Sequence, residues 1–169
     1  YTHAGPEIAV ASTKAYTSQV VLLSVLGLYF AEKLETADLE KIKELKKDIL
    51  KLPSQVEEIL KDLEKVKEFA KKVYKEKDMF FLGRGTDYAV SLEGSLKLKE
   101  ISYIHSEAYA SGELKHGPIA LIENGVTVVA TMTDERLVEK SISNVQEVVT
   151  RGAKVLLITS EDIKNDGFD

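Results

Sequence analysis

The second half of the chain alternates between short apolar runs and helical stretches. The apolar runs are MFFLG from Met79, VTVVATM from Val126 and KVLLIT from Lys154, and helical patterns from Asp87 to Ser102 and from Glu135 to Thr150 separate them. Parallel strands need long connections, usually helices, so this alternation predicts an α/β fold with a parallel sheet of three strands covered on both faces. Ligands then belong at the carboxyl ends of the strands.

The first part of the chain is expected to be helical. Residues 11 to 34 are mostly apolar over a length that suits one long helix, with Ser12 and Thr13 as candidate N-terminal caps. A helix this apolar belongs inside an α/β layer. Residues 37 to 76 are rich in Lys and Glu, carry apolar residues at helical spacing and contain Pro53, which predicts helices interrupted there. We interpret this segment as a helical connector with a solvated face.

Groups suited to proton transfer gather in one short stretch, KLKEISYIHSEAYASGELKHGP at residues 97 to 118. At about 100° per residue, the helical pattern that enters this stretch places Glu93, Lys97 and Glu100 on one narrow strip, here called the acid-base strip. Apolar positions flank it on both sides, with Leu92 and Leu96 on one and Val90, Gly94, Leu98 and Ile101 on the other. Charges between apolar flanks are typical of functional sites, because burial shifts pKa values. The alternative is a Glu93 to Lys97 pair that only supports the helix.

Glu100 is the strongest candidate for a general base. A free glutamate, with a pKa of about 4.3, is too weak a base for this work near neutral pH, and burial by the apolar flanks would raise that pKa. Lys97, one turn away, would lower it by stabilising the carboxylate, so the two effects oppose each other and their balance stays open. A Lys97 that faced the substrate would instead stabilise negative charge developing on its oxygens.

Two histidines follow the helix. The segment from Gly112 to Pro118 has the pattern of one helical turn stopped by Gly and Pro, which would display His116 at its end and bring Glu113 near it. His105 lies in a polar and aromatic run that also contains Glu107. A lone histidine is more often a surface or core residue than a catalyst, so His116 is the better candidate of the two.

Composition and local patterns remove several classes of function. The chain has no cysteine, which excludes thiol catalysis, disulfides and cysteine-ligated metals, and its net charge of −5, with interleaved acids and bases, argues against a nucleic-acid surface. No apolar run approaches 18 residues without polar interruption and no secretory signal is recognisable, so we expect no membrane span and a cytoplasmic protein. Gly83-Arg84-Gly85 predicts a tight turn rather than a phosphate loop, because a dinucleotide fingerprint needs a third glycine where Tyr88 stands.

Two segments resemble signatures of one known family. They are AGPEIAVASTKAYTSQV at residues 4–20 and FLGRGTDYAVSLEGSLKLKEISYIHSEAYASGELKHGPIALI at residues 81–122. Both are similar to the isomerase domain, a sugar-isomerase (SIS) domain, of the glucosamine-6-phosphate synthase family, the glutamine:fructose-6-phosphate amidotransferases. The resemblance implies a SIS-type, flavodoxin-like parallel sheet flanked by helices, and an enzyme that converts fructose-6-phosphate and glutamine-derived ammonia to glucosamine-6-phosphate.

The resemblance also implies a role for individual residues. Glu100 would move a proton between C1 and C2 of the sugar, with Lys97 assisting beside it. His116 would help to open the sugar ring and would reach the site from a neighbouring subunit, which requires a homodimer. Val10 and Ser12 match positions that line the sugar pocket, whereas His105, Glu107 and Glu113 keep supporting roles. No cofactor and no metal is implied.

The same family arranges its isomerase domain as two similar α/β lobes. We therefore expect residues 1–52 to hold the last helices of a first lobe and the connector, and residues 53–169 to hold most of a second lobe. The family's phosphate loops, its Schiff-base lysine and its glutaminase would lie in other parts of a longer protein. We expect this chain, as a fragment, to be inactive alone.

Two other functions use the same fold. One is a sugar-phosphate-sensing SIS module that binds without turnover, although such a module has no need for Lys97, Glu100 and His116 together. The other is a related sugar-phosphate isomerase or deglycase, which shares the glutamate chemistry.

Overall fold

The computed structural model describes residues 1–160 and contains two compact units that divide between Glu68 and Phe69. The division lies farther along the chain than the expected boundary at residues 52 and 53. That the first unit belongs to a first lobe stays a prediction.

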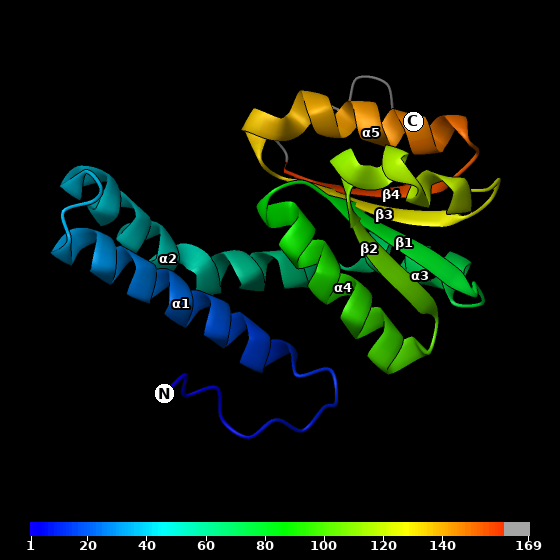
Figure 1. Cartoon of the computed structure of the whole chain (residues 1–169). Helices are drawn as coiled ribbons and strands as arrows, with labels where there is room; N and C mark the ends of the chain where they lie inside the picture. Colours follow the sequence, from blue (N-terminus) through cyan, green and yellow to red (C-terminus); the bar gives the residue numbers. More distant parts are fainter. Residues whose placement is uncertain (161–169) are drawn as a thin grey trace. The chain divides into compact units, whose positions relative to one another are not determined.

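A four-stranded parallel sheet forms the second unit (Figure 1). Its strands are β1 (Asp78–Gly83), β2 (His105–Ala110), β3 (Thr127–Met132) and β4 (Lys154–Thr159), in the spatial order β2-β1-β3-β4. Helix α4 (Thr86–Ser102) connects β1 to β2, and α5 (Val138–Thr150) connects β3 to β4. This is the order of a flavodoxin-like fold, so the predicted α/β class is confirmed.

The strand that sequence reasoning missed is β2. Its sequence, HSEAYA, is too polar to match a buried parallel strand, and we expected only a polar and aromatic run there. It forms a strand because it occupies the sheet edge and pairs only with β1, in a register that joins Asp78 to His105 and Gly83 to Ala110. Along it, His105 is exposed, Ser106 is buried against α4, and the remaining residues are half-buried, so no regular alternation of buried and exposed residues marks the strand.

Hydrophobic residues cover the sheet on both faces. On one face, Phe80, Leu82, Val128 and Ala130 pack with the side chains of α5 and of two 3-10 helices, η1 (Ser111–His116) and η2 (Pro118–Leu121). On the other, Met79 and Val129 pack with residues of α4 and of α3 (Glu64–Val73). Helices α4 and α5 therefore lie on opposite faces of the sheet, as Figure 1 shows.

The turn from β1 into α4 depends on glycine. A Cβ atom at Gly83 would lie 2.4 Å from the backbone carbon of Asp87, and Gly85 has a φ of 57°. These values confirm the prediction of a tight turn for Gly83-Arg84-Gly85.

Helices α1 (Thr13–Lys33) and α2 (Leu39–Lys61) make up most of the first unit. They lie side by side (Figure 1), and an ion pair of 2.6 Å joins Lys46 of α2 to Glu32 of α1. The expected interruption at Pro53 was wrong, because α2 continues through this residue. Pro53 is exposed, so the carbonyl group that it leaves without a helical partner can bind water.

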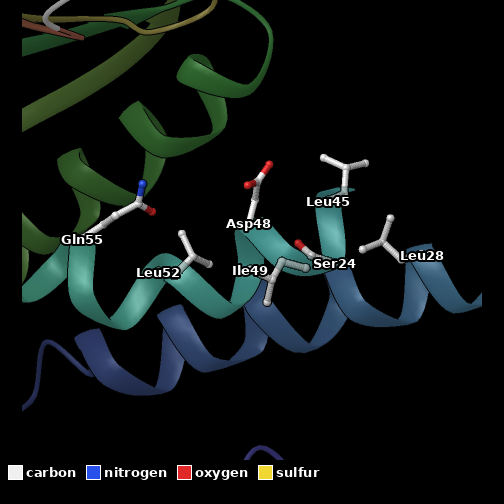
Figure 2. Close-up of a pocket in the computed structure, with 8 residues that line it drawn as sticks. Ser24, Leu28, Leu45, Asp48, Ile49, Leu52 and Gln55 are labelled. Carbon is white, nitrogen blue, oxygen red and sulfur yellow. The ribbon is translucent and has the colours of Figure 1, made fainter. Parts of the chain in front are cut away.

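A groove of about 480 Å³ runs between α1 and α2, with apolar side chains such as Leu28, Leu45 and Leu52 along it (Figure 2). The expected burial of α1 inside a layer is not met within residues 1–160, since none of its residues is buried. By length and composition alone, with a mean hydropathy of 1.2, α1 could also cross a membrane, but core helices of soluble proteins pass the same test. The sequence predicted no membrane span because no apolar run is uninterrupted, whereas the mean hydropathy of α1 reaches 1.2 although the helix contains Thr and Ser.

Candidate active site

The acid-base strip lies on α4 and is held together by Lys97. The Lys97 ammonium lies 2.7 Å from the Glu100 carboxylate and 3.4 Å from that of Glu93. All three side chains are partly covered, at 19% exposure for Lys97, 21% for Glu93 and 28% for Glu100. The predicted clustering is therefore confirmed. The pair of Glu93 and Lys97 that would only support the helix exists too, but Lys97 is shared, and its shorter contact is with Glu100.

Lys97 stays positively charged at neutral pH. The hydrogen bond to Glu100 raises the pKa of Lys97, and partial burial opposes this effect without reversing it. The cation therefore fixes the orientation of the Glu100 carboxylate and leaves one of its oxygens available. A carboxylate held in this way can accept a proton from a bound molecule and return it to a neighbouring atom.

The apolar flanks of the strip do not bury it in the way expected. Val90, Leu92, Leu96 and Ile101 are exposed at 42 to 65%. The physical reason is that α4 faces the sheet mainly with polar residues, while Leu98 is the flank residue that packs against the core cluster around Met79 and Val129.

Asp87, Ser91 and Ser95 form this buried polar face, here called the serine face of α4. They are spaced four residues apart, and all are at most 4% exposed. Ser91 Oγ donates to the carbonyl of Leu82 at 3.1 Å, and Ser95 Oγ lies 3.0 Å from Ser106 Oγ, which donates to the Ser95 carbonyl at 2.8 Å. Small hydrogen-bonded side chains let the helix approach the strands closely.

At the start of α4, Asp87 binds the loop after β3. Its two carboxylate oxygens accept hydrogen bonds from the Thr133 backbone N–H at 2.8 Å and from the Thr133 hydroxyl at 2.6 Å. Sequence reasoning missed this contact. The available signal was an acidic residue in the first turn of a helix, where the helix dipole favours it, but its partner lies 46 residues away.

His116 lies apart from the strip. It is exposed on η1, which covers the sheet face opposite α4, and in the described part of the chain no hydrogen bond or ion pair joins it to Lys97, Glu100 or Glu113. The expected single turn is present as η1, ending at Gly117 with a φ of 145°. The turn displays His116 as predicted, but it does not pair it with Glu113.

His105 and Glu107 have structural partners on the sheet edge. His105 Nδ1 lies 2.9 Å from Asp78 Oδ1, across the β1–β2 register. The Tyr109 hydroxyl donates a hydrogen bond to Glu107, and this bond, together with partial burial, raises the pKa of Tyr109 to about 12. Both residues therefore take part in interactions that stabilise the sheet edge.

Val10 and Ser12 lie just before α1 in the first unit. Ser12 occupies the N-cap position, but its hydroxyl donates to the Val10 carbonyl at 3.2 Å instead of capping the helix, so the cap prediction was wrong for its side chain. Ser12 has a φ of 52°, a left-handed conformation that is uncommon outside glycine. Its backbone is thus strained in a way that often marks ligand-binding segments.

No group of three or more potential metal ligands occurs among residues 1–160.

Comparison with known proteins identifies the fold family. The model of the SIS domain matches residues 72–165, more than half of the chain. The chain belongs to the SIS domain family. The acid-base strip lies on the first helix of this SIS domain, directly after its central strand β1.

Relatives of this SIS domain share one description. The chain is 59% identical over 165 residues to the "Glutamine--fructose-6-phosphate aminotransferase [isomerizing]" of Clostridium tetani, covering 98% of this chain and 27% of that protein. It is 64% identical over 156 residues to the protein of the same name from Clostridium perfringens, covering 92% and 26%. The chain therefore spans about a quarter of the length of these relatives.

A solved structure matches the SIS domain together with the helices before it. The C-terminal domain of glucosamine-fructose-6-phosphate aminotransferase from Francisella tularensis superposes with a TM-score of 0.90 and is 40% identical, covering 93% of this chain and 44% of that one.

Proposed function

We propose that this chain is part of an isomerizing glutamine:fructose-6-phosphate aminotransferase. The whole protein would convert fructose-6-phosphate and ammonia released from glutamine to glucosamine-6-phosphate, the first step towards UDP-N-acetylglucosamine. The observation that carries this proposal is the identity of 59 and 64% to proteins of that name over almost the entire chain.

Glu100 is the proposed proton carrier of the isomerisation. Its carboxylate is oriented by Lys97 at 2.7 Å, so one oxygen can take the proton from C1 of the open-chain sugar imine and deliver it to C2. Lys97 remains cationic and compensates the charge of Glu100 before the transfer.

Val10 and Ser12 are the proposed sugar-binding residues. The left-handed backbone of Ser12 and the turn of its hydroxyl towards Val10 set the local geometry of this segment. Strained backbone is retained where the surrounding structure or a ligand requires it, which supports a binding role.

His116 is the proposed ring-opening residue, contributed to the site of a second subunit. Its position on the sheet face opposite α4 supports this, because within one chain it does not meet Glu100. The protein would therefore act as a homodimer with shared sites. It would work in the cytoplasm on small phosphorylated sugars, without nucleic acid or membrane partners.

Product formation tests the proposed function. A full-length protein that carries this chain, given fructose-6-phosphate and glutamine, should form glucosamine-6-phosphate, detected by mass spectrometry. Binding of fructose-6-phosphate without any turnover would contradict the enzyme assignment and would favour a sensing module. Turnover of the sugar phosphate without incorporation of nitrogen would instead indicate a simple isomerase.

Hybrid dimers test the sharing of His116. Full-length Glu100→Gln and His116→Ala variants should each be inactive, whereas dimers reassembled from an equal mixture should recover about one quarter of wild-type activity, because half of the dimers are hybrids with one complete site each. Mixing each variant with itself is the control. If the mixture stays inactive although mass spectrometry shows hybrids, His116 acts within its own subunit or not at all.

A further inference from the structure

An open hollow of about 370 Å³ lies at the carboxyl edge of the sheet, on the face covered by α5. Arg84, directly after β1, and Gly112, just after β2, line one side of it, and residues of α5 line the other. Because β1 connects to β2 on one side and β3 lies on its other side, this edge is the topological switch point of the sheet. Open α/β sheets bind ligands at such points. None of the lining residues belongs to the acid-base strip.

Arg84 is held in a fixed orientation inside this hollow. Its Nε donates at 3.1 Å to Oδ1 of Asn144, a residue of α5 that is 6% exposed. The guanidinium lies directly over Gly112, since a Cβ there would come within 2.9 Å of Arg84 Nη2. The side-chain amide of Asn144 thus orients the guanidinium, and the lack of a side chain at Gly112 leaves space for it. Its terminal N–H groups have no hydrogen-bond partner, and no carboxylate lies within ion-pair distance, among residues 1–160.

The remaining charges around the hollow leave it with unpaired positive groups. Lys115 is paired with Glu147 at 2.8 Å, so these two offset each other. Lys140 and Ser143, on one turn of α5, add an ammonium and a hydroxyl, and Glu139, which is exposed and also lines the hollow, adds a carboxylate. Lys140 has no ion-pair partner in the described part of the chain.

We propose that this hollow binds the phosphoryl group of a small phosphate ester, at a site separate from the acid-base strip. The fork of Arg84 satisfies two oxygens, and Lys140 and Ser143 offer donors to a third. A carboxylate has only two oxygens, which the Arg84 guanidinium would bind, and it would leave Lys140 and Ser143 without an acceptor. A phosphoryl group, with three oxygens, is therefore the better match. This inference stands independently of the proposed aminotransferase reaction.

Calorimetric titration of the 169-residue chain with inorganic phosphate tests the site. Sodium chloride is replaced by sodium phosphate at constant ionic strength, which keeps general screening unchanged. We expect saturable binding with a dissociation constant on the order of 1 mM. The side-chain Nε–H resonance of Arg84 should shift along the same titration curve. Acetate, the carboxylate probe, should bind at least about fivefold more weakly, because it engages fewer donors.

Two variants and one matched control locate the binding. Arg84→Gln removes the fork and should weaken phosphate binding at least about tenfold, the loss expected for a charge-assisted contact. Gly112→Ala changes no charge but displaces the flexible end of Arg84, and it should weaken binding severalfold. Arg151→Gln makes the same charge change on an exposed residue at the far end of α5 and should bind like the wild type.

Circular dichroism of each variant confirms that it is folded before titration. If Arg84→Gln fails to fold, Gly112→Ala still decides the question. Absence of saturable phosphate binding, or unchanged affinity in the folded variants, would overturn the proposal. Acetate binding as tight as phosphate would overturn the phosphoryl assignment.

Discussion

Replacing Glu100 with Gln in a full-length protein that carries this chain should lower the formation of glucosamine-6-phosphate by about 10³-fold, within the range for loss of a general base. The amide has almost the same shape and can still accept a hydrogen bond from Lys97, so the change removes proton transfer and little else. Hydrolysis of glutamine by the same protein should remain measurable, since we expect the glutaminase to lie in another part of the longer protein.

Two further glutamates provide matched controls for this experiment. Glu93→Gln removes the more distant partner of Lys97, at 3.4 Å, and should cost far less activity than Glu100→Gln. Glu123→Gln changes an exposed residue outside the strip and should have no effect. Synthesis that survives Glu100→Gln at near wild-type rates would refute the assignment of this residue as the proton carrier.

Replacing Asp87 with Ala should give the largest loss of stability in the second unit, about 3 kcal/mol in the free energy of unfolding. The carboxylate is 4% exposed and accepts two hydrogen bonds from Thr133, so its removal breaks both and also removes a negative charge that interacts favourably with the helix dipole in the first turn of α4. Urea unfolding followed by circular dichroism measures the loss.

Asp78→Ala is the matched control, because that carboxylate is 59% exposed and, among residues 1–160, its side chain pairs only with His105. It should cost less than about 1 kcal/mol. Thr133→Val removes one of the two donors, and a double-mutant cycle with Asp87→Ala should show a coupling energy of about 1 kcal/mol or more. Equal losses for Asp87→Ala and Asp78→Ala would show that the contact with Thr133 contributes nothing.

The fold class and the acid-base strip were predictable because both depend on local periodicity. Apolar runs separated by helical stretches predict a parallel sheet, and residues at positions 93, 97 and 100 share a helix face whatever surrounds them. The edge strand β2 was not predictable in the same way, since a strand paired on one side only needs no continuous apolar run. Pro53 misled the prediction for α2, because an exposed helix tolerates the lost hydrogen bond.

The expected burial of the apolar flanks of the acid-base strip was the main error about the site. Hydrophobicity assigns burial to Leu92 and Leu96, whereas the structure buries Ser91 and Ser95 and leaves both leucines exposed. The serines are buried because Leu82 and Ser106 supply hydrogen-bond partners, and that pairing arises only when strands distant in sequence come together. No pattern within the helix encodes it.

The serine face of α4 has a consequence for movement. Its hydrogen bonds are directional, so α4 cannot slide along the sheet without breaking the Ser95–Ser106 and Asp87–Thr133 contacts together. A purely hydrophobic interface would allow such sliding at a lower cost in free energy, because hydrophobic contacts are not directional. Any displacement of Glu100 that keeps these contacts must therefore carry α4, β1, β2 and β3 along as one rigid body, with the hinge outside them.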